Sequence, residues 1–289
     1  MFRIAFLLSV FTVSAQASFL ETAREEPVPI FEGKAVSPKF DWDDLTPYTK
    51  ANAQPLDWKA LFGGEARVVY LGEPHYVKAV KNILASRMDD FKKAGITHIG
   101  LEMFGTDRQG VLDTFDPAQT RDTLKKEWGW EPDAYTGMIK AADDASMSRV
   151  ALDMPAKDRA KMQTECKASG RKGCMGELFQ ARDKHMIKAL SRFLSENPDA
   201  RILILIGNDH LEVTHQPEAL TKATGVKTRS YSFLFGADFF DVAIDEAGLT
   251  WKDTFLPLPP TDRGVDGVIS MPEIRKEGNG TGWLPGSPD

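Results

Sequence analysis

Cysteine and histidine are scarce in this sequence, and basic residues are fewer than acidic ones. The chain of 289 residues has two cysteines and five histidines, and its 36 lysines and arginines are outnumbered by 42 aspartates and glutamates. The resulting formal charge of −6 at pH 7, with no basic stripe among interleaved aromatic residues, argues against a nucleic-acid surface. No internal repeat is present, and the 42% hydrophobic content is enough for a sizeable core.

The chain also lacks a hydrophobic run long enough to cross a membrane, which takes about 20 residues. Its N-terminal apolar run, Ile4 to Ala15, follows Arg3 and is followed by the small-residue pattern Ala15-Gln16-Ala17. This order predicts a signal peptide over residues 1–17, cut after Ala17, and an exported protein that is periplasmic or secreted. An amphipathic or membrane-anchored N-terminus is the alternative. No cysteine lies near the cut, so the sequence does not predict a bacterial lipoprotein anchor.

The two cysteines, Cys166 and Cys174, lie on either side of the polar loop KASGRKG. In an exported protein this spacing favours a local disulfide, with two unpaired thiols as the alternative. A metal-binding role is disfavoured, because no second cysteine pair or histidine stands at ligand spacing.

Strand and helix patterns alternate along most of the chain, which predicts a three-layer α/β fold: a mostly parallel sheet flanked by helices on both faces. The crossover helix at 77–95 has apolar residues three and four positions apart, and such crossovers join parallel strands. The predicted strands are 66–73, 97–104, 149–155 and 200–211, followed by 228–235 and 239–245 as antiparallel edges. We expect a lead-in segment at 18–59, one domain at 60–250, and a C-terminal extension and tail at 251–289.

Four predicted strands end in ionisable residues. Glu73 and His75 follow the first, Glu102 ends the second, Asp153 the third and His210 the fourth. Because sites in open parallel sheets form beyond the carboxyl ends of strands, we expect these side chains to meet at one edge. A strand leaving the core can end in any polar residue, so the interpretation depends on the set, which includes two of the five histidines.

Each of these two histidines lies three residues after a glycine, Gly72 or Gly207, in a G-x-x-H pattern. Glycine allows a sharp turn at the strand end and leaves space for a close ligand. In the helix predicted around ARDKHM, Asp183 falls inside the apolar stripe and Arg182 on its border. A buried carboxylate needs a partner, so the two residues form either a structural ion pair or a support that orients a site histidine.

The motifs LGEPH, GLEMF, ARDKHM and IGNDHL, in this order, resemble the ChaN-like haem-binding family, which is grouped with Tiki and TraB proteins and erythromycin esterases. The resemblance covers residues 60–245 and implies an α/β sheet with a pocket at its strand ends. It also implies haem binding and iron uptake, with a tyrosine as haem ligand. Tyr76 and Tyr135 are the candidates, and His75 is a further one. Two positions depart from the family pattern: Tyr76 replaces a small polar residue, and Asp153 stands where asparagine is expected.

Haem binding in haem and iron uptake is therefore the first functional hypothesis, with haem, a second copy of the chain and an outer-membrane uptake receptor as candidate partners. The second is a Zn²⁺ or Mn²⁺ hydrolase, with His75, Glu102 and His210 as ligands and Glu73 as general base. The third is a metal-free esterase in which His75 activates water and is oriented by Glu73 or Asp183. A binding module without catalysis is the fourth.

Overall fold

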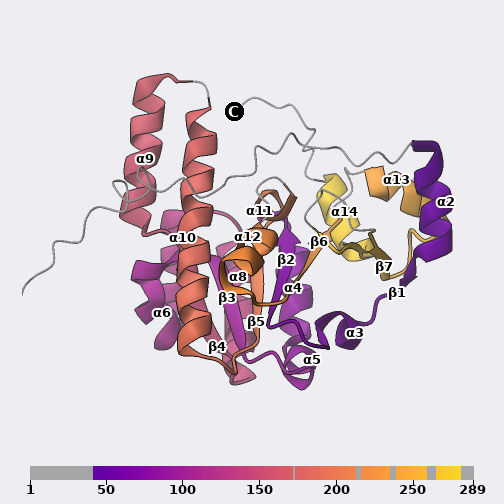
Figure 1. Ribbon diagram of the computed structural model, residues 1–289, viewed down its shortest axis with the longest axis horizontal. Coiled ribbons are helices and arrows are strands. Elements are labelled where there is room, and N and C mark those ends of the chain that lie inside the picture. Colours follow the sequence, from indigo (N-terminus) through magenta and orange to yellow (C-terminus); the bar gives the residue numbers. More distant parts are fainter. Residues whose placement is uncertain (1–41, 172, 213–215, 235–238, 259–264, 281–289) are drawn as a thin grey trace, which may run out of the picture. The chain divides into compact units, whose positions relative to one another are not determined.

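The centre of the fold is a mixed sheet of eight strands in the order β1-β7-β8-β6-β2-β5-β3-β4 (Figure 1). The computed structural model describes residues 42–171, 173–212, 216–234, 239–258 and 265–280, all within the second of two units into which the chain divides, 31–289. The strands are β1 Gln54–Pro55, β2 Val68–Glu73, β3 His98–Gly105, β4 Ser148–Asp153, β5 Ile202–Gly207, β6 Thr228–Phe233, β7 Thr254–Pro257 and β8 Gly267–Ser270.

Six neighbouring strands, from β8 through β6, β2, β5 and β3 to β4, run parallel to one another, whereas β7 is antiparallel to both β8 and β1. The register places Glu73 opposite Gly207, so β2 and β5 end at the same level. The carboxyl ends of the central parallel strands therefore form one continuous edge.

Helices cover both faces of this sheet, and α10 crosses one of them (Figure 1). The helices are α2 Trp42–Asn52, α3 Trp58–Phe62, α4 Lys78–Ser86, α5 Met88–Lys93, η1 Thr106–Arg108, α6 Gln109–Asp113, α7 Pro117–Glu127, α8 Pro132–Asp144, α9 Ala156–Ser169, α10 Cys174–Glu196, α11 Asp209–Glu212, α12 Gln216–Thr224, α13 Phe239–Glu246 and α14 Pro272–Gly280.

Alternation along the strands divides the core into two layers. In β2, Val69 and Leu71 face the layer that includes residues of α4, α5 and α8, while Val68 and Tyr70 face the layer that includes residues of α10, α12 and α13. The α/β architecture predicted from the sequence is thus confirmed. Continuous apolar strands such as β5 are buried on both faces, as expected for the inside of a parallel sheet.

Three sequence predictions need correction. Residues 228–233 form the inner parallel strand β6, not an antiparallel edge. Residues 239–245 belong to helix α13, not a strand: Phe240, Ala243 and Ile244 are buried at helical spacing. The crossover helix predicted at 77–95 is two helices, α4 and α5, separated at Arg87, whose φ is −112° and ψ is 5°.

The ends of the described region also contribute to the sheet. Strands β7 and β8 come from residues that we expected in a C-terminal extension, and β1 comes from the predicted lead-in. A disulfide between Cys166 and Cys174 joins α9 to α10, as predicted. Across the described ranges, no helix has the length and apolar character needed to span a bilayer. The predicted signal peptide lies outside the described residues.

Candidate active site

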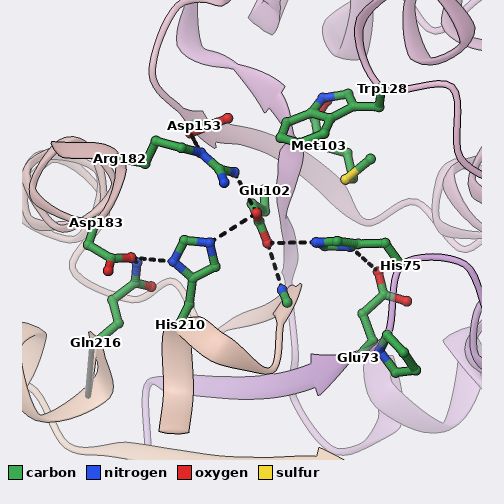
Figure 2. Close-up of polar contacts among 12 residues, drawn as sticks. Glu73, His75, Glu102, Met103, Trp128, Asp153, Arg182, Asp183, His210 and Gln216 are labelled. Atoms are coloured by element: carbon green, nitrogen blue, oxygen red, sulfur yellow. Dashed lines mark hydrogen bonds and ion pairs between the residues drawn. The ribbon is translucent and has the colours of Figure 1, made fainter. Parts of the chain in front are cut away.

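Glu102, on β3, is the centre of a buried polar cluster at the carboxyl edge of the sheet (Figure 2). Its Oε1 accepts hydrogen bonds from Arg182 Nη2 at 2.5 Å and His210 Nε2 at 3.1 Å, and its Oε2 accepts one from the Gly207 backbone N–H at 2.6 Å. Burial raises the pKa of this carboxyl, but the charges on His210 and Arg182 outweigh burial and hold the pKa well below its usual value. Glu102 is therefore ionised.

His75 approaches Glu102 from the end of β2. Its Nε2 lies 3.7 Å from Glu102 Oε2, beyond hydrogen-bond distance, and its Nδ1 lies 3.2 Å from Glu73 Oε1 and 3.1 Å from the Tyr135 hydroxyl. The His75 side chain is 18% exposed, whereas those of Glu73, Glu102 and His210 are each 1% exposed. His75 is thus the member of this histidine–carboxylate group that solvent or a ligand can reach.

Glu73 contacts the Nδ1 atom of His75. Its carboxylate accepts from the Tyr135 hydroxyl and pairs with Lys81 Nζ, whose side chain has no exposed surface. Burial raises the pKa of Glu73, but Lys81 and His75 together lower it below its usual value. Since an ionised carboxylate only accepts hydrogen bonds, the Nδ1 atom of His75 carries the proton. Nε2 of a neutral His75 therefore presents a lone pair.

Lys81 was not among the residues singled out from the sequence. It lies on α4, and its Nζ also donates to the backbone carbonyl of His75 at 2.7 Å and to that of Val77 at 3.0 Å. The signal that could have identified it is its place in the apolar stripe of the predicted helix, one residue after Val80. A charged residue in such a stripe needs a buried partner, and Glu73 is that partner.

His210 is held on the opposite side of Glu102. Its Nδ1 bonds to Asp183, which also accepts from Gln216 Nε2 at 3.0 Å, and its ring stacks on Phe179 with centroids 4.0 Å apart. Burial lowers the pKa of His210, but Glu102 and Asp183 outweigh burial and raise the pKa to about 9. His210 is therefore an imidazolium at neutral pH.

Arg182 connects the third strand end to the cluster. Its Nε donates to Asp153 at 2.9 Å, and Asp153 also accepts from Arg159 Nη1 at 2.6 Å. Both guanidinium groups lie over the Trp128 ring, at 3.9 Å for Arg159 and 5.1 Å for Arg182. The sequence left open whether Arg182 and Asp183 form a structural ion pair or orient a site histidine. In the structure, Arg182 bonds to Glu102 and Asp183 bonds to His210 (Figure 2).

The backbone around the cluster leaves room for these contacts. A Cβ at Gly207 would lie 2.9 Å from His75 Nε2, so only glycine allows the ring to approach β5 this closely. The pairing of β3 with β4 shifts register between Leu101 and Gly105, a bulge-like irregularity at the position of Glu102. Both features are local departures from regular strand structure at the polar edge.

Tyr135 and Glu102, which were predicted as haem and metal ligands, already have partners within the protein. Burial raises the pKa of Tyr76, and burial with the nearby Glu73 raises that of Tyr135 well above its usual value. The hydroxyl of Tyr135 is also bonded to Glu73. Both Glu102 oxygens are already occupied by hydrogen-bond donors. Within the part of the chain that is described, no group of three or more histidine, cysteine or acidic side chains is arranged to hold a metal ion.

Comparison with known proteins agrees with the resemblance seen in the motifs. Residues 64–174 match a family model described as haem-binding uptake, Tiki superfamily, ChaN. This segment is similar to that family. The matched segment contains Glu73, His75, Glu102 and Tyr135, whereas Arg182, Asp183 and His210 follow it in the sequence. No curated protein sequence matches the chain significantly.

Among solved structures, a mutant of the erythromycin esterase EreC in its open conformation superposes with a TM-score of 0.56 and 12% identity, covering 82% of this chain and 96% of that chain. At this identity the likeness establishes the fold alone. ChaN of Campylobacter jejuni, described with cofacial haem binding, gives a TM-score of 0.47 and 11% identity over 71% of this chain and 87% of that chain.

Proposed function

We propose that this protein is a metal-independent hydrolase of the esterase kind, with His75 as the general base. The observation that carries the proposal is the position of the His75 ring. Its Nδ1 is held by Glu73 and Tyr135, while its Nε2 faces Glu102 at 3.7 Å, beyond hydrogen-bond distance (Figure 2). A histidine oriented by a carboxylate through one nitrogen, with the other nitrogen making no hydrogen bond to the described residues, is the arrangement that acid–base catalysis needs.

The residues divide the chemical step as follows. His75 Nε2 removes a proton from water as the water oxygen bonds to the ester carbonyl carbon, and the resulting imidazolium is stabilised by Glu73 and Glu102. The same nitrogen then returns the proton to the leaving alcohol as the ester C–O bond breaks. The protonated His210 and Arg182 keep Glu102 ionised and fixed, so that Glu102 is available to stabilise charge on His75 without taking the proton itself.

The test is hydrolysis of a panel of aryl esters, such as 4-nitrophenyl acetate, by the wild type and His75→Asn. We expect the substitution to reduce kcat/KM by about 100-fold or more, the usual contribution of a general base. His98→Asn is the matched control, because His98 lies at the opposite end of β3. Activity should survive a chelator. Equal activity in wild type and His75→Asn, or loss of activity on chelation, would reject the proposal.

Haem binding is the second candidate function, supported by the family match over residues 64–174. Because the Tyr135 hydroxyl is bonded to Glu73 and His75 is the partly exposed member of the histidine–carboxylate group, this candidate depends on His75. Haemin titration should give a Soret shift in the wild type that is lost in His75→Ala and kept in Tyr76→Phe. The absence of any shift would remove this candidate. An uptake role, a homodimer and an outer-membrane receptor are further parts of the same proposal.

A further inference from the structure

Trp130 is a large apolar side chain that the fold leaves half exposed beside the candidate site. Its indole is 48% exposed and stacks on His75, with ring centroids 5.4 Å apart and planes 12° from parallel. Single exposed hydrophobic residues are ordinary on protein surfaces, so exposure alone carries no conclusion. The stacking is informative, because it places the indole against the partly exposed ring of His75.

The backbone on both sides of Trp130 adopts left-handed conformations. Gly129 has φ of +81°, and Glu131, which has a side chain, has φ of +37° and ψ of 46°. A non-glycine residue in this region costs on the order of 1 kcal/mol and persists only where the surroundings enforce it. Here α7 ends on one side and α8 begins on the other, so the strained turn holds Trp130 outward between two fixed helices.

Trp128 packs against the Trp130 ring in this turn. Its indole N–H donates to the Met103 carbonyl at 2.8 Å, its ring lies against Arg159, and it contacts Trp130 with centroids 5.9 Å apart. Trp128 is therefore committed to contacts within the protein (Figure 2). Trp130, by contrast, presents half of its surface to solvent.

The charges of the buried cluster beside Trp130 indicate what kind of group could bind next to the indole. Each carboxylate of the cluster has a cationic partner in contact with it, and the four pairs are Glu73–Lys81, Glu102–Arg182, Asp153–Arg159 and Asp183–His210. These four pairs balance one another in charge. A charge-balanced cluster favours neither anions nor cations, and an exposed indole favours flat apolar groups through offset stacking.

We propose that Trp130 is the specificity-determining residue of the site and binds a planar, uncharged aromatic group of the substrate beside His75. The inference deepens the proposed function, since it names the ligand class that the hydrolase would accept. Stacking of this kind, with the apolar area that it buries, is expected to change affinity by about tenfold.

The test measures binding separately from catalysis. Naphthalene-2-carboxamide is planar and its amide resists hydrolysis, and its saturated analogue decahydronaphthalene-2-carboxamide is of similar size but not flat. Isothermal titration calorimetry should show that the wild type prefers the planar compound. Trp130→Ala should bind that compound about tenfold more weakly, and Trp130→Phe should retain most of the affinity. Trp251→Ala is the matched control, because Trp251 is 84% exposed.

Three outcomes would overturn the inference: no detectable binding of the planar compound to the wild type, equal binding of both compounds, or unchanged affinity in Trp130→Ala. Circular dichroism of each variant checks that the fold is kept. The inference and the proposed function fail separately. Binding that depends on Trp130 in a protein without esterase activity would reject only the proposed hydrolase function. Esterase activity whose KM is unchanged in Trp130→Ala would reject only the proposed role of Trp130 in binding an aromatic group.

Discussion

At the scale of single residues, Gly207 determines how closely His75 can approach the end of β5. A methyl group there would lie 2.9 Å from His75 Nε2 and 3.6 Å from Glu102 Oε2. We predict that Gly207→Ala keeps the fold but displaces the His75 ring, and lowers esterase kcat/KM by about tenfold or more, because a misplaced catalytic group loses much of its effect. Steady-state kinetics together with thermal melting would check this.

Gly137→Ala is the control for that substitution. Gly137 lies on the exposed side of α8, where a Cβ would meet nothing within 4 Å. Alanine in a helix is more favourable than glycine by about 0.5–1 kcal/mol, so this variant should melt slightly higher and keep its activity. Full activity in Gly207→Ala would show that the space beside His75 is not needed.

His210 carries a second residue-scale prediction, concerning pH. Its folded pKa of about 9 lies above the ordinary histidine value, because the attraction of Glu102 and Asp183 outweighs burial. Native protein therefore binds a proton that the unfolded chain has lost between about pH 6.5 and 9. The stabilisation is complete below this range and is lost as pH rises through it, with a slope of at most about 1.4 kcal/mol per pH unit.

Urea unfolding at pH 6.5, 7.5 and 8.5 would measure that slope. His210→Gln should be less stable at pH 6.5 and should lose the dependence on pH in this range, whereas His98→Gln should retain it. A wild type whose free energy of unfolding stays constant from pH 6.5 to 8.5 would show that His210 is neutral in the folded protein.

At the scale of elements, α4 depends on a residue far away in the sequence. Its N-cap residue, Val77, makes no side-chain hydrogen bond to the helix. Instead, the Glu277 carboxylate of α14 accepts from the backbone N–H groups of Lys78 at 3.0 Å and Ala79 at 2.8 Å. This contact caps the helix that follows His75 and carries Lys81.

We predict that Glu277→Ala lowers the free energy of unfolding by about 1 kcal/mol, the usual cost of losing an N-terminal cap. Glu273→Ala, an exposed change on the same helix, should have little effect. Chemical denaturation of the three proteins makes the comparison. Equal losses of unfolding free energy in both variants would mean that any substitution on α14 destabilises the protein. The cap by Glu277 would then make no separate contribution.

One element, α13, also shows where the sequence pattern was insufficient to distinguish a helix from a strand. Segment 239–245 contains aromatic and β-branched residues that favour a strand, but its buried residues Phe240, Ala243 and Ile244 have helical spacing. Asp241 is buried and bonded to Arg275 Nε at 2.6 Å. A short apolar segment is ambiguous between helix and strand, and the partner that resolves it lies on α14.

At the scale of the whole molecule, we propose that the protein is exported and cut after Ala17. The Cys166–Cys174 disulfide is consistent with an oxidising compartment. After expression of the full sequence in a bacterial host, mass spectrometry should detect a mature chain that begins at Ser18, in the periplasm or the medium. Ala17→Arg places a large charged residue at the cut and should leave the precursor intact. An uncut, cytoplasmic wild type would contradict the proposal.

The sequence by itself determined the order of most strands and helices and the chemistry at the strand ends, because periodicity and the residues after each strand are local properties. Glu73, His75, Glu102 and His210 are recognisable from these local properties alone. Only the tertiary structure decided how these groups are paired. Lys81, Gln216 and Trp130 enter the cluster from separate segments, and the charge state of His210 depends on carboxylates brought beside it by folding. Such contacts join positions distant in the chain, and no local pattern encodes them.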